Sequence, residues 1–256
     1  MAYRWYTWLA DEFRAAGLEV IEVTGWKTRG RPASSGANDA RGLNVHHTAA
    51  SSSFSNPAPG VALLITGRED LPGPIAHYAV DYLGRVWVVA AGRANVNGAN
   101  RGVPNIPAGD GNAQLIGNEV ITNGTQALST KQLEAIYLTS AVVLRKLGRD
   151  VDGYLYRHAD TSKTGKWDIG QLTTAQLRDG TKAALKRLQT GTPTEEDDMA
   201  YSRQQLKEIF AETMRENIGD VAANDEKSWW SQGIRKLVRE EVAKELDARA
   251  DKAADA

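Results

Sequence analysis

The sequence predicts a mixed α/β domain, in which helices flank a central β-sheet, followed by a small helical C-terminal region. Two apolar patterns support this prediction: short alternating or continuous apolar segments typical of strands, and longer segments with apolar residues at helical spacing. The chain has 256 residues, of which 41% are hydrophobic. This is enough for one medium domain with its own core and a smaller addition.

The first quarter of the chain predicts a helix followed by two strands. In residues 5–16 the apolar side chains recur at helical spacing, and Gly17 follows as a stop signal. Residues 18–23 alternate apolar and acidic side chains, as in a strand with one face in water. Residues 25–41 are rich in Gly, Arg and Ser and predict a loop, and residues 42–47 predict a short strand.

The next segments predict a hairpin and a long loop. Residues 61–66 are apolar and compatible with a short helix or a short strand, and the pattern does not choose between them. Residues 75–80 and 85–90 flank Tyr82-Leu83-Gly84 and predict a β-hairpin. Residues 92–111 carry many Gly, Asn and Pro residues and predict a surface loop.

The remaining elements complete a domain over residues 1–190. Residues 115–121 form an apolar strand segment that contains one glutamate. Residues 130–147 keep near-helical apolar spacing and predict a strong helix. Residues 155–158 predict a short strand or strand edge, and residues 174–188 predict a closing helix.

A change in composition separates a C-terminal region from this domain. Residues 191–198 have the polar, acidic composition of a linker. Residues 202–218 and 228–250 predict two amphipathic helices. A region of about 60 residues has a poor core of its own, so we expect residues 199–256 to self-associate or to dock on another molecule. Met199 directly follows the acidic segment, so an internal start is conceivable.

Charge and composition narrow the classes of partner and of metal ligand. Residues 1–194 carry 21 Lys+Arg against 16 Asp+Glu, which gives +5, and residues 195–256 carry 10 against 16, which gives −6. A basic first part suits an anionic polymer such as a bacterial wall, and nucleic acid equally well. No nucleic-acid motif occurs, so we expect no such partner. The chain has no cysteine, which leaves His, Asp and Glu as metal ligands.

The chain carries no sign of a targeting or membrane segment. The first residues lack the apolar core of a signal peptide, and no apolar stretch of about 18 residues occurs. We therefore expect no signal peptide, no membrane insertion and a protein that is made in the cytoplasm. A substrate outside the membrane would then require another factor to release the protein.

Two histidine positions and one aspartate could form a metal site. His46 and His47 end a predicted strand, and a polar loop separates His158 from Asp168. This loop is long enough to fold back on itself. Two His and one Asp leave the fourth position of a catalytic zinc open for water, whose pKa then falls to about 7. Neighbours on a strand face opposite ways, so only one of His46 and His47 should bind, and the pattern does not choose between them.

An acid and a lysine could complete a hydrolytic site. Glu119 lies inside an apolar strand, where a carboxylate is expensive unless it faces a polar site. Burial would raise its pKa into a range useful for proton transfer. Lys166, two residues before Asp168, could stabilise a developing negative charge. The alternatives are an edge-strand charge for Glu119 and a solvated loop position for Lys166.

Several segments together resemble a known family. In chain order they are Val45-His46-His47-Thr48-Ala49, Gly84-Arg85-Val86-Trp87, Ile116-Gly117-Asn118-Glu119, and His158 through Lys166-Trp167-Asp168. They are similar to the zinc-dependent type-2 N-acetylmuramoyl-L-alanine amidases, which are related to peptidoglycan-recognition proteins. Residues 64–68, 71–74 and 90–95 resemble the catalytic domains of actinobacteriophage endolysins. The resemblance covers roughly residues 43–188.

The resemblance implies an activity and a set of roles. It implies a phage endolysin that uses Zn²⁺ to hydrolyse the amide between N-acetylmuramic acid and L-alanine of bacterial peptidoglycan, which lyses the host wall. By position, His46 would be the first ligand, with His158 and Asp168 as the other two. Glu119 would match the catalytic glutamate of the family, and Lys166 its catalytic lysine. The alternative is a peptidoglycan-binding module without activity, but such relatives typically lack the third ligand, and Asp168 is present.

The chain departs from the family pattern at three positions. Some members use a tyrosine where this chain has Ala76, so the proton-transfer role falls more strongly on Glu119. Asn118 stands where the family often has isoleucine. Val96 stands where related endolysins usually have a histidine, which puts the specificity of that loop in doubt.

Other polar and aromatic residues have both a functional and a structural interpretation. His47 is expected to pack in the core or to support a ligand, and His77 to be either structural or part of a substrate groove. Arg93, Asn95 and Asn97 are candidates for substrate contact, although Asn and Gly in loops commonly just form turns. The seven tryptophans could stack on sugars, although most are expected to fill the core.

Overall fold

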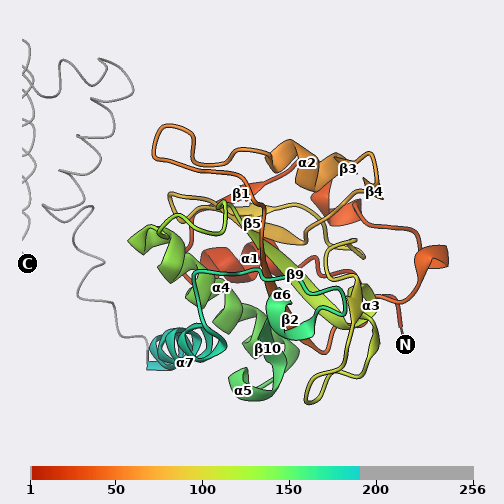
Figure 1. Cartoon of the computed structure of the whole chain (residues 1–256). Helices are drawn as coiled ribbons and strands as arrows, with labels where there is room; N and C mark the ends of the chain where they lie inside the picture. Colours follow the sequence, from red (N-terminus) through yellow and green to blue (C-terminus); the bar gives the residue numbers. More distant parts are fainter. Residues whose placement is uncertain (1, 191–256) are drawn as a thin grey trace, which may run out of the picture. The chain divides into compact units, whose positions relative to one another are not determined.

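The computed structural model describes residues 2–190 of the chain (Figure 1). The chain divides into two units, Met1–Thr194 and Glu195–Ala256. The predicted linker at residues 191–198 and the predicted helical region at residues 199–256 lie outside the described residues. None of the helices in the described part is long and apolar enough to cross a membrane.

A six-stranded mixed sheet forms the centre of the described unit. Its strand order is β1-β6-β5-β9-β2-β10. The strands are β1 (Val20–Glu22), β2 (Gly42–His47), β5 (Tyr78–Val80), β6 (Val86–Val88), β9 (Leu115–Val120) and β10 (Leu155–Arg157). The β5–β6 pair is antiparallel and every other neighbouring pair is parallel. The mixed sheet confirms the predicted fold class, and the β5–β6 pair confirms the predicted hairpin.

Helices cover both faces of this sheet. On one face, α1 (Leu9–Ala15) and α4 (Thr130–Leu147) pack against the strands, and α7 (Thr174–Thr190) packs against α4 and β10 (Figure 1). The main core fills this layer, and its largest fully buried side chains include Phe13 and Tyr78. On the other face, α2 (Val61–Thr66) contributes to a smaller core with Ala79 of β5.

Short helices and two-stranded ribbons make up the connections. The short helices are η1 (Trp26–Thr28), η2 (Ala33–Ser35), α3 (Gly111–Gln114), α5 (Val151–Tyr154) and α6 (His158–Thr161), and the ribbons pair β3 (Gly67–Arg68) with β4 (Leu71–Pro72) and β7 (Ala99–Asn100) with β8 (Gly109–Asp110). The β7–β8 ribbon lies inside the segment that the sequence predicted as a plain loop.

The first helix is shorter than the sequence predicts. The predicted helix over residues 5–16 begins only at Leu9. The residues before it pair with distant backbone instead: the Arg4 N–H donates to the Asn38 carbonyl and the Tyr6 N–H to the Ala91 carbonyl, both at 2.8 Å. Tertiary hydrogen bonds thus override the local apolar periodicity at this end.

The direction of three neighbouring strands gathers the chemically interesting residues at one edge. β9, β2 and β10 run parallel, so their carboxyl ends meet at the same edge of the sheet. His46 of β2 is the register partner of Glu119 of β9, and His158 directly follows β10. In open α/β sheets, ligand sites form outside the carboxyl ends of the strands.

Replacing Ser129 with alanine should destabilise the unit by about 1 kcal/mol. Ser129 is the N-cap of α4, and its hydroxyl oxygen accepts from the Gln132 N–H at 3.0 Å. The measurement is urea unfolding of the full chain. Thr130→Ala, at the exposed next position, is the control and should change the free energy of unfolding by less than about 0.5 kcal/mol. Equal losses in both variants would contradict the capping role.

Candidate functional site

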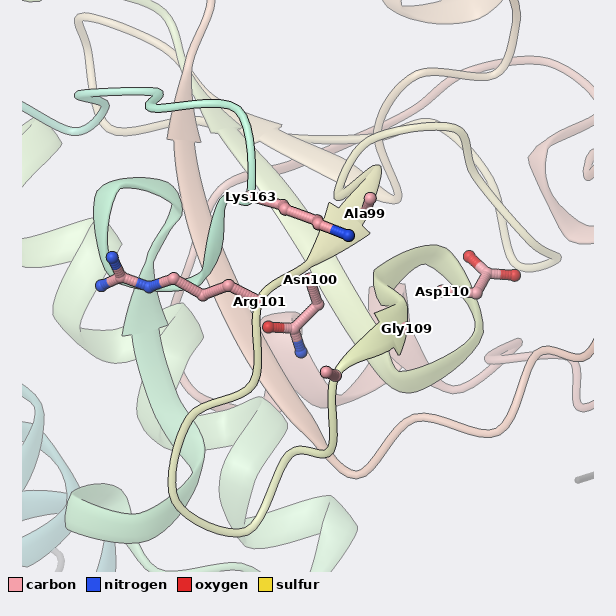
Figure 2. Close-up of a pocket in the computed structure, with 7 residues that line it drawn as sticks. Ala99, Asn100, Arg101, Gly109, Asp110 and Lys163 are labelled. Carbon is pink, nitrogen blue, oxygen red and sulfur yellow. The ribbon is translucent and has the colours of Figure 1, made fainter.

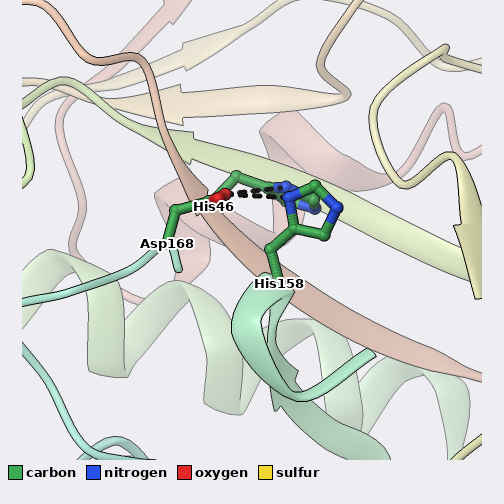
Figure 3. A group of neighbouring side chains, drawn as sticks. All are labelled: His46, His158 and Asp168. Atoms are coloured by element: carbon green, nitrogen blue, oxygen red, sulfur yellow. Dashed lines mark hydrogen bonds and ion pairs between the residues drawn. The ribbon is translucent and has the colours of Figure 1, made fainter. Parts of the chain in front are cut away.

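Two imidazoles and one carboxylate meet at this edge of the sheet. His46, His158 and Asp168 each offer a ligand atom, and these atoms lie within 4.8 Å of one another (Figure 3). Asp168 Oδ2 lies 3.4 Å from His46 Nδ1 and 2.9 Å from His158 Nδ1. Ligand atoms about 2.0–2.1 Å from a tetrahedral zinc are about 3.3 Å apart. The donor set and its spacing therefore fit a zinc ion bound by both Nδ1 atoms and the carboxylate.

Hydrogen bonds of the chain bring His158 and Asp168 together. The Ala159 N–H donates to the Asp168 carbonyl at 2.6 Å, which closes the intervening loop onto α6. Asp160 holds the start of α6, because its carboxylate accepts from the Arg157 N–H at 3.0 Å and from the Thr174 hydroxyl at 2.7 Å. The folded-back loop that the sequence analysis expected is thus fixed by backbone bonds as well as by the side chains.

A buried asparagine orients His46. The Asn97 side-chain oxygen lies 2.9 Å from His46 Nε2, and the Asn97 amide group donates to the Leu115 carbonyl at 2.8 Å. Because the Asn97 oxygen can only accept, Nε2 carries a proton, and Nδ1 is the nitrogen that faces Asp168. A metal ion would bind Nδ1 after this nitrogen has lost the proton that it shares with Asp168.

Burial and close pairing shift the pKa values of His46 and Asp168. His46 is 2% exposed and Asp168 is 8% exposed. Burial lowers the pKa of His46, and the nearby His158 lowers it further, against the opposing effect of Asp168. Burial alone would raise the pKa of Asp168, but its hydrogen bonds with His158 and His46 bring the pKa well below its usual value. A charged carboxylate beside a neutral imidazole is the state in which both bind metal.

Glu119 lies on the His46 side of the sheet with one oxygen unpaired. Its Oε2 is buried and has no hydrogen-bond partner within residues 2–190. Burial raises the pKa of Glu119 well above the usual value, and the Asp168 carboxylate adds to this effect. Arg68 and Lys166 act in the opposite direction. An uncompensated carboxyl with a raised pKa is suited to accepting and releasing a proton.

His47 lies on the opposite side of β2 from His46, as alternation along a strand requires. It is not part of the three-residue group. Its ring packs edge-on against Trp167, with ring centroids 4.5 Å apart. The geometry therefore favours His46 over His47 as a metal ligand, which the sequence pattern left open.

The other candidate residues hold the surrounding loops. His77 is fully buried, and its Nδ1 accepts from the Gly117 N–H at 3.1 Å; burial lowers its pKa to about 4. Arg93 is buried and pairs with Asp110 at 2.7 Å. Asn95 donates to the Pro72 carbonyl at 2.8 Å. Contact of these residues and of Asn97 with substrate stays a prediction.

A separate hollow of about 640 Å³ lies beside the β7–β8 ribbon (Figure 2). Its lining includes Lys163, which belongs to the loop between His158 and Asp168, but none of the three candidate ligands. In Figure 2 the Arg101 side chain points away from the ribbon, and its Nε donates to the Asp160 carbonyl at 2.7 Å. Its guanidinium therefore hydrogen-bonds to α6, and Arg101 is also part of the lining of the hollow.

Two features of the site are not evident from the sequence. The sequence predicts Asn97 only as a substrate contact, because its bond to His46 joins residues 51 positions apart and local sequence carries no signal of it. Arg68 comes near Glu119 only through the β3–β4 ribbon. A cation beside an apolar segment is too common a pattern to have identified it.

Comparisons with known proteins match one family model and several solved structures. A family model described as N-acetylmuramoyl-L-alanine amidase matches residues 36–171. Solved structures that match include the Staphylococcus aureus hydrolase AmiA in complex with its ligand, at 17% identity over 72% of this chain and 92% of that chain, with a TM-score of 0.47. The Ph2119 endolysin from the Thermus scotoductus MAT2119 bacteriophage Ph2119 matches at 15% identity over 64% and 99%, with a TM-score of 0.42. The comparison with curated proteins finds no match.

Exchanging each of the two neighbouring histidines should separate their roles in metal binding. His46→Gln removes one of the three donors, and we expect zinc affinity to fall by more than about 100-fold. A fall of about 100-fold is the most that the loss of a residue that only supports a ligand typically causes. His47→Gln is the matched control and should bind one zinc per chain as the unchanged protein does. The measurement is equilibrium dialysis with metal analysis. Loss of zinc in His47→Gln with retention in His46→Gln would reverse the assignment.

Proposed function

Because the chain belongs to the N-acetylmuramoyl-L-alanine amidase family, we propose that it is a phage endolysin whose site holds zinc. As an amidase, it hydrolyses the amide between the lactyl group of N-acetylmuramic acid and L-alanine in peptidoglycan. The observation that carries the proposal is the meeting of His46, His158 and Asp168, with ligand atoms within 4.8 Å, beside the carboxyl of Glu119.

Different residues of the site would bind the metal, transfer the proton and stabilise the developing charge. His46, His158 and Asp168 would hold the ion, which supplies Lewis acidity and a water nucleophile at neutral pH. Glu119 takes a proton from the attacking water and delivers it to the leaving alanine nitrogen as the C–N bond breaks. Lys166 stabilises the negative charge that develops on the carbonyl oxygen. The products are a free lactyl carboxyl on the sugar and a free amino group on alanine.

The surroundings of Glu119 suit this shuttle. A residue that serves first as a base and then as an acid must accept a proton from water and later release it. The pKa of such a residue should therefore lie near the working pH. Burial raises the pKa of Glu119, while Arg68 and Lys166 moderate the rise. The pairing of Glu119 with His46 in the β2–β9 register supports this role.

The phage origin rests on sequence. Residues 64–68, 71–74 and 90–95 resemble actinobacteriophage endolysins. We propose that the protein stays in the host cytoplasm until the membrane is opened and then lyses the wall. Residues 199–256 would bind wall polymer or form homo-oligomers. Expression in a susceptible host should cause lysis only when the membrane is permeabilised, and lysis without permeabilisation would contradict this order of events.

The bond that is cut can be identified by mass spectrometry of digested cell walls. An amidase should release peptides with new N-terminal alanine, while the number of reducing sugar ends stays constant. New reducing ends without free alanine would indicate a glycosidase and would refute the proposal. Chelation of metal before digestion should abolish the release of peptides, and added zinc should restore it.

Glu119→Gln should retain zinc and lose at least about 100-fold in turnover, because the amide cannot accept and return a proton. The measurement combines metal analysis with the release of alanine amino groups. Glu69→Gln, an exposed carboxylate on the connection of the nearby β3–β4 ribbon, is the matched control and should keep full activity. Full activity in Glu119→Gln would remove this residue from the reaction.

A further inference from the structure

A large aromatic side chain stands in solvent beside the candidate metal ligands. Trp167 is 53% exposed, the most exposed of the large hydrophobic side chains within residues 2–190. It directly precedes Asp168 and directly follows Lys166. A half-exposed indole contributes much less hydrophobic stabilisation than a buried one. Its exposed position beside the candidate ligands therefore suggests a role in binding.

Close packing fixes the exposed indole in place. The indole and the His47 ring pack edge to face, with ring centroids 4.5 Å apart. Two glycines make room for it: a Cβ at Gly124 would lie 2.3 Å from Trp167 Cη2, and a Cβ at Gly170 would lie 2.5 Å from Trp167 Cζ3. A ring that is held at several points while it stays exposed loses little conformational entropy when a ligand binds.

The indole contacts a side chain on one face of β2, and the cations of the site act on a side chain that shares the other face. Trp167 packs on His47, whose side chain leaves β2 on the opposite face from His46. Arg68 and Lys166 instead act on Glu119, which shares the His46 face. A substrate whose amide lies at Asp168 would therefore have an aromatic neighbour on one side and positive charge on the other.

The two halves of the substrate match these two sides. A short lactyl ether joins a pyranose ring to the reacting carbonyl, and the face of that ring presents C–H groups that suit the face of an indole. The stem peptide beyond alanine carries carboxylates and short aliphatic chains, which suit Lys166 and Arg68 better than an indole. This step rests on the proposed function.

We propose that Trp167 is a specificity-determining residue that binds a sugar ring of the glycan strand beside the scissile amide. Its ring face stacks on the pyranose, while His47, Gly124 and Gly170 hold it in position. The amidase would thereby prefer peptides that are still attached to sugar over the same peptides without it.

The test compares two substrates that share the scissile amide. One is a disaccharide-linked stem peptide, and the other is a lactyl stem peptide without sugar. In the zinc-loaded full chain, Trp167→Ala should lower kcat/KM about tenfold for the first substrate, mainly by raising KM. A tenfold change corresponds to the free energy of one lost aromatic contact. It should leave the second substrate unchanged. Trp167→Phe keeps a ring and should fall in between.

A second tryptophan provides the matched control. Trp5 is 44% exposed and packs on Tyr3, with ring centroids 5.5 Å apart, so Trp5→Ala should leave both substrates unchanged. Zinc content and thermal unfolding of Trp167→Ala report whether the site is intact. An equal loss on both substrates, or no loss on either, would overturn the sugar contact.

A binding measurement keeps this inference separate from the proposed reaction. Calorimetry with peptide-free glycan strands on Glu119→Gln, and on the same variant with Trp167→Ala added, measures the contact without cleavage. We expect about tenfold weaker glycan binding in the double variant. If the unchanged protein fails to cleave the disaccharide peptide, the proposed function fails, whereas unchanged glycan affinity in the double variant overturns the role of Trp167 alone.

Discussion

The candidate site depends on one buried carboxylate that is held against two imidazoles. Asp168 accepts at 2.9 Å from His158 Nδ1 and lies 3.4 Å from His46 Nδ1, and all three side chains are buried. A buried carboxylate is expensive unless it is paired. Each imidazole can compensate it with a proton, and a divalent cation can compensate it more completely. The buried carboxylate of Asp168 thus requires a positive charge beside it, from a protonated imidazole or from a metal ion.

The register of the parallel strands fixes the positions of most residues of this site. β2 and β9 are parallel neighbours, so their register alone places His46 opposite Glu119. β10 is the parallel neighbour on the other side of β2 and ends one residue before His158. Asp168 comes from a loop, but the Ala159–Asp168 backbone bond ties that loop to α6. Loops carry the variable part of such sites while the strands fix their geometry.

The sequence predicted the elements whose signals are local and missed those that depend on distant partners. The hairpin of β5 and β6 and the helix α4 follow from short-range periodicity. Residues 61–66 are a helix, which an apolar run of that length cannot reveal. The geometry distinguishes His46 from His47 as a candidate ligand only when β9 and the 158–168 loop have packed beside β2. Asn97 is the clearest case, because its role is defined by a partner 51 residues away.

The two carboxylates of the site show how surroundings assign chemistry. Asp168 and Glu119 are both removed from bulk water, and burial acts on both in the same direction, raising the pKa. Asp168 overcomes this effect because His158 and His46 hydrogen-bond to it. Glu119 Oε2 has no partner in the described part of the chain, and the charge of Asp168 opposes its ionisation. Carboxyls whose pKa values are driven apart take different roles: the charged one suits a metal, and the other suits a proton.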